Sequence, residues 1–125
     1  MKEFSKAWKS SKNPGKQRKY RIKSPLHIKR KLLSAHLSKE LRKRYGKRNI
    51  VLRKGDKVKV LSGQFKKYEN KVEIINITKS RIYVNGIEVT KKDGSKKQVA
   101  IHPSNLMITE LNLDDKLRMK ILERK

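Results

Sequence analysis

The second half of the chain, from residue 50 onward, alternates hydrophobic and polar residues with a period of two. Residues 57–60 read KVKV, a pattern typical of a β-strand with one buried and one solvated face. Asn85-Gly86 and Asp93-Gly94 are strong signals for tight turns. Further strand patterns occupy 72–76, 81–84, 87–101 (two strands around a turn) and 105–111. About five short strands with brief turns predict a mainly β fold, with a small antiparallel barrel over residues 50–111.

Short helices are expected before this barrel, in a basic segment over residues 25–49. Ser24 and Pro25 provide a cap and a first-turn proline for one helix, which runs through the sequence LHIKRKLL. Ser38 caps a second helix, and Gly46 stands just past its end.

A last short helix is expected within residues 112–125. Asp114 is the predicted N-cap, and Leu117, Ile121 and Leu122 are spaced to dock on the barrel.

Residues 1–24 form an arm with few aliphatic side chains. Such a segment buries too little apolar surface to offset the entropy of ordering it. We therefore expect this arm to be disordered unless a partner such as RNA binds it.

The charge of the chain indicates what that partner is. The 125 residues carry a formal net charge of +25. Residues 1–54 hold 20 lysines and arginines but only Glu3 and Glu40 as acids, a net +18, whereas residues 55–125 have a net +7. Self-repulsion of this size opposes compaction, and a polyanion would relieve it. Nucleic acid is the first candidate polyanion and an anionic membrane surface is the second. We favour nucleic acid, because the chain has neither an apolar run long enough to span a membrane nor a secretory signal.

Catalysis is not expected. The chain has no cysteine, and His27, His36 and His102 are scattered, with no acidic residue at metal-ligand spacing. No phosphate-binding glycine loop of the Walker type occurs. Asp56 is better explained as a turn residue that bonds nearby amides. We therefore predict a protein that is not an enzyme and has no cofactor, metal or small-molecule substrate.

The stretch GDKVKVLSGQFKKYENKVEII, residues 55–75, combines strands with a cationic loop. It resembles the KOW motif, and the matching positions are Gly55, Asp56, Val58, Val60, Gly63, Lys66 and Val72. Lys67 and Asn70 stand where the motif usually has glycine. Asparagine tolerates the left-handed conformation better than most residues, so Asn70 is expected to keep the turn, whereas Lys67 departs from the motif's usual loop geometry.

Three flanking stretches extend the resemblance over about residues 17–125. They are residues 24–50, IHPSNLMIT at 101–109, and the closing LDDKLRMKILERK. Together they resemble large-subunit ribosomal protein twenty-four in its archaeal and eukaryotic branch. The resemblance implies an SH3-like barrel in a structural protein of the cytoplasmic ribosome. It also implies binding to the 5′ region of the large-subunit ribosomal RNA early in assembly, and a place on the outer face near the mouth of the nascent-chain tunnel. Expected partners are that RNA, neighbouring ribosomal proteins and targeting or translocation factors at the tunnel exit, without membrane insertion.

Candidate RNA contacts follow from the basic arm and, by position, from the family's motifs. They are Arg18, Lys19, Tyr20, Arg21, His27, Lys29, Arg30, Lys31, Arg42, Lys43, Arg44, Lys47, Arg48, Lys57, Lys59, Gln64, Lys66, Lys67, Tyr68, Lys71, His102 and Ser104. Cations would contact phosphates, and flat rings would stack on exposed bases.

Some of these residues have a structural alternative. Phe65, next to the candidates of the loop, and Tyr68 either stack on bases or fill the barrel. For His102 we favour a bond to a backbone group over a phosphate contact.

Two other functions remain open on the motif alone. One is a KOW transcription elongation factor that binds RNA polymerase, although such a module is expected to carry less charge in its flanks. The other is a chromatin-type protein that binds DNA through nonspecific phosphate contacts.

Overall fold

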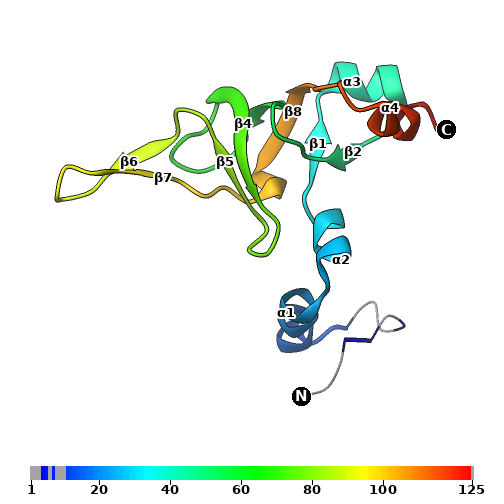
Figure 1. Cartoon of the computed structure of the whole chain (residues 1–125), viewed down its shortest axis with the longest axis horizontal. Helices are drawn as coiled ribbons and strands as arrows, with labels where there is room; N and C mark the ends of the chain where they lie inside the picture. The colour runs from blue at the N-terminus through cyan, green and yellow to red at the C-terminus, as the bar shows by residue number, and fades with distance from the viewer. Residues whose placement is uncertain (1–3, 6, 8–10, 125) are drawn as a thin grey trace.

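A curved six-stranded sheet forms the centre of the molecule (Figure 1). The computed structural model describes residues 4–5, 7 and 11–124. The strands of this sheet are β1 (Ser34–Leu37), β2 (Asn49–Val51), β3 (Lys57–Val60), β4 (Glu69–Asn76), β5 (Arg81–Val84) and β8 (Leu106–Glu110). Their spatial order is β2-β1-β8-β3-β4-β5. The backbone groups of Ile82 and Ile101 exchange two hydrogen bonds of 2.8 and 2.9 Å, which gives the outer edge of β5 a partner. The predicted mainly β fold with a small barrel is confirmed.

The sequence pattern predicted neither the short strands β1 and β2 nor helix α1 (Pro14–Lys23), and of these β1 has the largest effect on the sheet. Strand β1 lies inside the segment expected to be helical and pairs with β8 in parallel, with Leu37 opposite Ile108. The sheet is therefore mixed, because its other strand pairs are antiparallel. The sequence SAHL alternates polar and apolar residues as KVKV does, and Ala35 and Leu37 are buried, but this short signal lies between two helix patterns, which favour a helical segment.

The core consists of aliphatic side chains from the alternating positions of the strands. Val58 and Val60 of β3 are buried, while the lysines that alternate with them are half-buried. Leu106 and Ile108 of β8 are fully buried beside them, and Phe65 and Tyr68 pack against this core from its edge. The period of two in the sequence thus corresponds to the inner and outer faces of the barrel.

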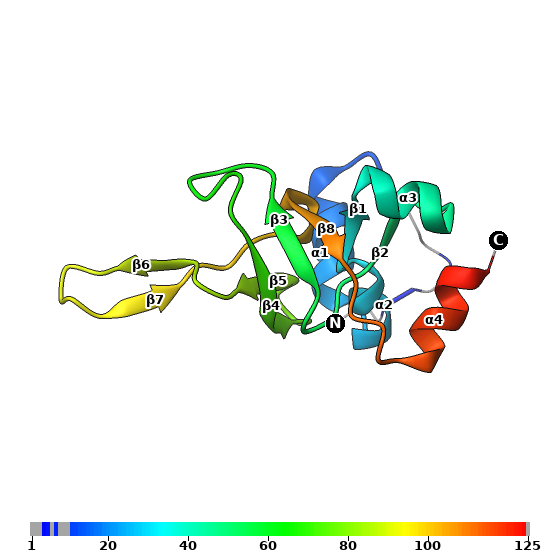
Figure 2. The same cartoon turned by 90° about the horizontal axis from the view of Figure 1, so that it is seen from above.

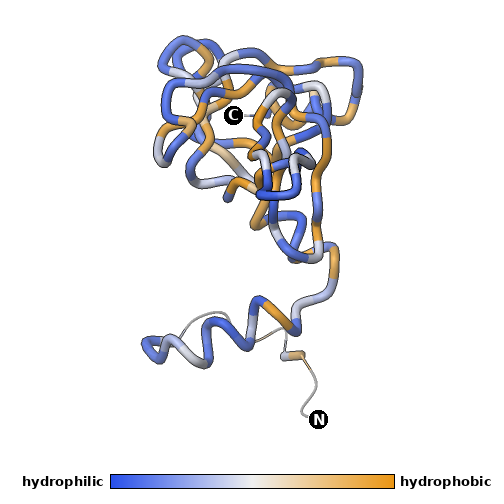
Figure 3. Tube along the Cα trace, turned by 90° about the vertical axis from the view of Figure 1, so that its left-hand side faces the viewer, coloured by the Kyte–Doolittle hydropathy of each residue, from blue (hydrophilic) through white to orange (hydrophobic). Residues whose placement is uncertain are grey.

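Two helices precede the sheet and carry no buried residue. They are α1 (Pro14–Lys23) and α2 (Leu26–Lys31). Figure 3 shows them as a mostly hydrophilic segment that extends away from the barrel. The predicted arm therefore contains a helix in the structure, and its residues 1–3, 6 and 8–10 lie outside the described residues. Ser24 does not cap α2 as predicted, because its hydroxyl donates to the carbonyl of Arg21 at the end of α1.

Helix α3 (Lys39–Tyr45) has the predicted ends. The Ser38 hydroxyl accepts a hydrogen bond from the amide of Leu41 at 3.3 Å, and Gly46 follows in the left-handed conformation.

Helix α4 (Lys116–Glu123) begins one residue later than predicted. Asp115, and not Asp114, caps it by accepting from the amide of Leu117. Leu122 is buried as expected, but Leu117 and Ile121 are exposed, and Arg118 is the second buried residue of the helix.

A separate hairpin projects from the barrel. Strands β6 (Glu88–Thr90) and β7 (Lys96–Gln98) form a two-stranded sheet of their own, closed by the predicted turn at Asp93-Gly94. Figure 2 shows the hairpin extending from the side of the barrel opposite α4. A 3-10 turn, η1 (Pro103–Asn105), leads from the returning chain into β8.

Candidate nucleic-acid interface

The predicted RNA contacts are all exposed or half-buried, and they are spread over several elements. They lie on α1, α2, α3 and the loop after it, on the strand pair β3–β4 with its loop, and at the start of η1 (Figure 1). The structure therefore does not gather them into one compact pocket. It distributes them over an extended cationic surface, an arrangement suited to a large polyanion.

Helix α1 is held by its cap and not by burial. The Asn13 side-chain oxygen accepts hydrogen bonds from the amides of Gly15 at 2.9 Å and Lys16 at 3.3 Å. The Tyr20 ring lies 4.9 Å from the Phe4 ring, centroid to centroid. Since no residue of the helix is buried, its cations Arg18, Lys19 and Arg21 all reach solvent.

Some of the cations around α3 contact other groups of the protein, and others are exposed to solvent. The Arg42 Nε donates to the Leu37 carbonyl at 2.8 Å, and the Lys47 ammonium donates to the Ile121 carbonyl. The Arg44 guanidinium lies 5.4 Å from the centroid of the Tyr45 ring, within the range of a cation–π contact. Lys43 and Arg48 are exposed.

The β3–β4 loop departs from expectation at both positions where glycine is usual. Lys67 itself adopts the left-handed conformation, with φ of 73°, and its amide donates to the Val60 carbonyl at 2.9 Å. Asn70 lies in β4 with a negative φ, so the prediction that it keeps the turn is wrong. The loop thus retains the motif's geometry at position 67 with a lysine, which leaves Lys66 and Lys67 both exposed.

Tyr68 anchors this loop to the neighbouring turn. Its hydroxyl donates to the Asn85 carbonyl at 3.2 Å and accepts from the Asn70 side-chain amide at 3.3 Å. A Cβ at Gly86 would lie 2.1 Å from the Tyr68 hydroxyl, so the turn requires glycine for space as well as for its φ of 80°. The ring is half-buried against the core, which supports the structural alternative for this residue.

Lys57 has an acidic partner on the outer face of the barrel. Its ammonium donates to the Glu110 carboxylate at 2.7 Å. This hydrogen bond and the negative charge of Glu110 raise the pKa of Lys57. Part of its charge is therefore already compensated within the protein.

His102 bonds a backbone group. Its Nδ1 accepts from the Ser104 amide at 3.3 Å and lies 2.7 Å from the Ser104 hydroxyl, so it caps η1. Burial lowers the pKa of His102, and the positive charges of Arg81 and then Arg21 lower it further. The ring is thus held as a neutral imidazole whose other nitrogen, Nε2, carries the proton.

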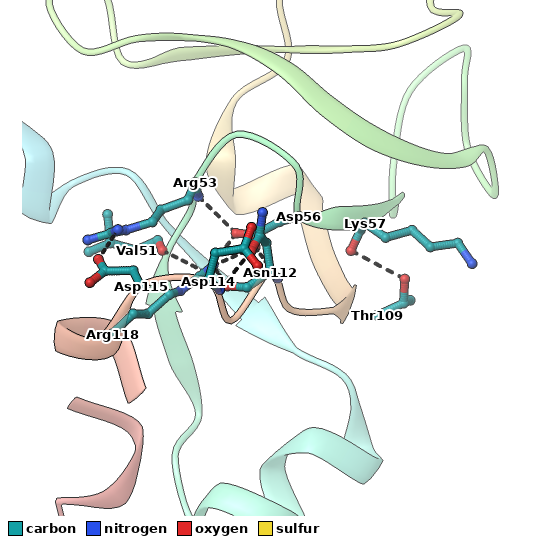
Figure 4. Close-up of polar contacts among 9 residues, drawn as sticks. All are labelled: Val51, Arg53, Asp56, Lys57, Thr109, Asn112, Asp114, Asp115 and Arg118. Atoms are coloured by element: carbon teal, nitrogen blue, oxygen red, sulfur yellow. Dashed lines mark hydrogen bonds and ion pairs between the residues drawn. The ribbon is translucent and has the colours of Figure 1, made fainter. Parts of the chain in front are cut away.

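A buried ion pair fixes α4 to the barrel (Figure 4). The Arg118 guanidinium donates to both carboxylate oxygens of Asp56, at 2.6 and 2.7 Å, and Asp56 also accepts from the amides of Arg53 and Asn112. Asp56 therefore bonds nearby amides as the sequence predicts. Its arginine partner was missed, because no local signal distinguishes Arg118 from the other cations of the chain.

Known proteins similar to this chain decide the family. Residues 11–125 match the family that comprises the eukaryotic ribosomal proteins L26 and their archaeal counterparts. The chain is 45% identical over 115 residues to the large ribosomal subunit protein uL24 of Korarchaeum cryptofilum (strain OPF8). The aligned region covers 92% of this chain and 88% of that protein. The chain belongs to this family of ribosomal proteins. It is also 44% identical over 115 residues to the uL24 protein of Methanosphaera stadtmanae (strain ATCC 43021 / DSM 3091 / JCM 11832 / MCB-3), which covers 92% of this chain and 98% of that protein.

Membership of this ribosomal family confirms several predictions. The chain is a structural component of the large ribosomal subunit, takes part in translation in the cytoplasm, and is not an enzyme. Its partners are ribosomal RNA and other ribosomal proteins. The family is thus ribosomal and is neither that of the KOW elongation factors nor a chromatin family.

Two kinds of feature are absent from the described residues 4–5, 7 and 11–124. No helix there is long and apolar enough to cross a bilayer. No three histidine or acidic side chains within those ranges group closely enough to hold a metal ion.

Two cationic features of the structure are absent from the predicted set. Arg81 at the start of β5 lies near His102, and four exposed lysines flank the hairpin turn: Lys91, Lys92, Lys96 and Lys97. The paired lysines on either side of the predicted turn at Asp93-Gly94 could have been named as candidate RNA contacts from the sequence alone. The proximity of Arg81 and His102 was not, because they are brought together by the pairing of Ile82 with Ile101.

Proposed function

We propose that the chain binds large-subunit ribosomal RNA directly, with the barrel as a rigid anchor and the basic N-terminal helices lying between RNA helices. The observation that supports this most is the lack of acidic residues among the cations of α1 and α2. Only Glu3 and Glu40 are acidic among the first 54 residues, and neither lies in α1 or α2. A helix with this composition and no buried residue gains little from the rest of the chain and much from phosphate.

The mode of binding is recognition of shape and phosphate. The grooves of A-form RNA offer side chains little sequence information, so a basic surface reads the fold of the RNA and not its sequence. Screening limits the attraction to about 8 Å at physiological salt, which requires close contact along the whole surface. The separated positions of α1, α3 and the β3–β4 loop match such a distributed contact (Figure 1).

The place in the ribosome is proposed from the family resemblance. On that basis the chain binds the 5′ region of the large-subunit RNA and helps to nucleate subunit assembly. It then lies on the outer face near the exit of the nascent-chain tunnel, where targeting or translocation factors would be its neighbours.

Competition binding tests this proposal. The full chain is titrated with transcripts of the 5′ and 3′ regions of an archaeal large-subunit ribosomal RNA and with duplex DNA, all at matched salt. The 5′ transcript is expected to bind tightest. Equal affinity for all three would contradict specific ribosomal RNA binding and favour nonspecific phosphate contact.

The β3–β4 loop provides a sharper test. Replacing both Lys66 and Lys67 with alanine is expected to weaken RNA binding and to make the slope of log K against log salt shallower by about 1–2. The double variant Lys116→Ala and Lys120→Ala, which removes two cations of α4 outside the candidate set, is the matched control. An unchanged slope in the loop variant would show that the loop does not face RNA.

A further inference from the structure

Two clefts lie side by side at the base of the β6–β7 hairpin. The first has a volume of about 230 Å³ and the second about 480 Å³. Arg81, Val99 and Ala100 line both clefts, so these residues form the ridge between them.

The first cleft has both apolar and polar lining residues. The apolar ones include Phe65, Val99 and Ile101, and the polar ones include Gln64, Arg81 and His102. A cavity of about 150 Å³ accommodates benzene, so this cleft has room for one flat heterocyclic ring system but not for a helix. Because Nδ1 of His102 accepts from the Ser104 amide, the ring offers Nε2–H as a fixed donor. Gln64 adds a side-chain amide that both donates and accepts.

The second cleft is cationic. Lys79, Arg81, Lys91 and Lys97 line it together with Tyr83, and none of its lining residues is acidic. Glu73 is the acidic residue bonded to its wall, through a 2.7 Å hydrogen bond from Gln98. Four cations around an aromatic ring match a stretch of sugar-phosphate backbone.

We propose that the two clefts together bind an unpaired segment of RNA, with one extruded base in the first cleft and its flanking phosphates in the second. This inference rests on the proposed RNA-binding function and specifies a subsite within it. Phe65 and the Arg81 guanidinium provide surfaces for stacking, while Gln64 and His102 face the base edge with hydrogen-bonding groups. An intact base pair is too large for the first cleft, and a base that is already unpaired enters it without the cost of breaking a pair. An acidic peptide would match the cations of the second cleft but not the apolar lining residues of the first.

Filling the first cleft without changing charge tests the base subsite. Ala100 is exposed on the ridge, so Ala100→Trp places an indole there while leaving every cation in place. The affinity of the full chain for the 5′ ribosomal RNA transcript is expected to fall about tenfold, the loss of one base-stacking contact, with an unchanged salt slope. Thr78→Trp, at an exposed position that lines neither cleft, is the matched control and is expected to bind as the wild type does.

A second measurement holds even if Ala100→Trp fails to fold. The wild-type chain is titrated with single-stranded RNA heptamers of adenosine or uridine, and with an abasic ribose-phosphate heptamer, while amide resonances are recorded by NMR. The base-containing heptamers are expected to shift residues 62–65 and 101–102, which line only the first cleft, whereas the abasic heptamer shifts only residues that line the second cleft. Identical shifts from all three would overturn the proposal, as would equal displacement of the adenosine heptamer by poly-glutamate.

Different results would contradict the proposed RNA-binding function and the proposed base subsite. If the wild type does not prefer the ribosomal transcript to duplex DNA, the proposed function is wrong. If it does, and Ala100→Trp binds that transcript with wild-type affinity, only the base subsite is wrong.

Discussion

At the scale of single residues, Asp56 and Arg118 have the most demanding environment in the described part of the chain. Both are buried, with exposures of 0% and 2%, and the pair is bidentate. Two further amides saturate the carboxylate, and Arg118 also donates to the carbonyls of Asn112 and Val51. Removing either member would leave the other charge buried without its counterion, which is far more costly than losing a surface pair.

Replacing Arg118 with methionine is therefore expected to lower the free energy of unfolding by about 3–5 kcal/mol. Urea denaturation followed by circular dichroism measures this change. Lys116→Met on the exposed face of α4 is the control and should cost less than about 0.5 kcal/mol. The double variant Asp56→Asn with Arg118→Met should lose less than the sum of the single variants, since they share one interaction. Strict additivity would contradict the coupling.

Lys67 illustrates a second residue-scale effect, a side chain in a conformation that favours glycine. Its φ of 73° is fixed by the bond from its amide to Val60 and by the return of the loop into β4. A residue with a Cβ is strained there by about 1–2 kcal/mol. The strain is tolerated because the adjacent strands determine the loop's path, and it leaves a second cation at the tip.

The variant Lys67→Gly is expected to stabilise the protein by about 1 kcal/mol, because glycine relieves this strain. Thermal unfolding would show it as a higher midpoint. Lys66→Gly is the matched control: its φ is negative, so glycine there only adds unfolded-state entropy and should destabilise by about 0.5–1 kcal/mol. Destabilisation by both variants to the same extent would argue against strain at position 67.

At the scale of elements, the helices differ in what holds them. Helix α4 is fixed by Leu122 and Arg118, which are both buried, whereas α1 has a good cap and no buried side chain. A ten-residue helix stabilised mainly by its ends is marginal in water, and α1 also carries repelling like charges. Its order is expected to depend on what it binds.

Amide hydrogen exchange on the free chain tests this expectation. Residues 15–23 should exchange close to the rate of an unfolded peptide, while Val58 and Ile108 in the paired strands β3 and β8 should be strongly protected. Addition of the 5′ ribosomal RNA transcript should slow exchange in α1 selectively. Strong protection of α1 without RNA would show that the helix docks stably on the barrel.

At the scale of the whole molecule, a small hydrophobic core has to stabilise the fold against the repulsion of a net charge of +25. Ion pairs in the described residues include Asp56–Arg118, Lys57–Glu110 and Arg53–Asp115, but 36 lysines and arginines far outnumber 11 acids, so most cations face one another through solvent. The free protein therefore folds against its own repulsion, and salt should relieve part of it.

Raising potassium chloride from about 20 mM to 300 mM is expected to stabilise the free chain by about 1–2 kcal/mol, or roughly 4–8 °C in Tm. Differential scanning calorimetry measures this shift. Sucrose of equal osmolality is the control for cosolute effects that do not involve charge. A Tm that stays constant or falls with salt would mean that the repulsion is already balanced within the fold.

The sequence by itself determined much of this protein. Alternation at Val58 and Val60 specified strands, because side chains of a strand point to opposite faces. Ser38 and Gly46 specified the ends of α3, since caps are local chemistry. The charge excess and the matches to a ribosomal motif and family specified the class of partner.

Only the tertiary structure decided features that depend on long-range contacts. Strand β1 forms because β8 offers it a parallel partner, and Arg118 is buried because α4 brings it to Asp56. The clefts beside Arg81 exist because Ile101 pairs with Ile82. Local propensity and periodicity describe neighbours along the chain, so they carry no information about which distant residues the closed barrel brings together.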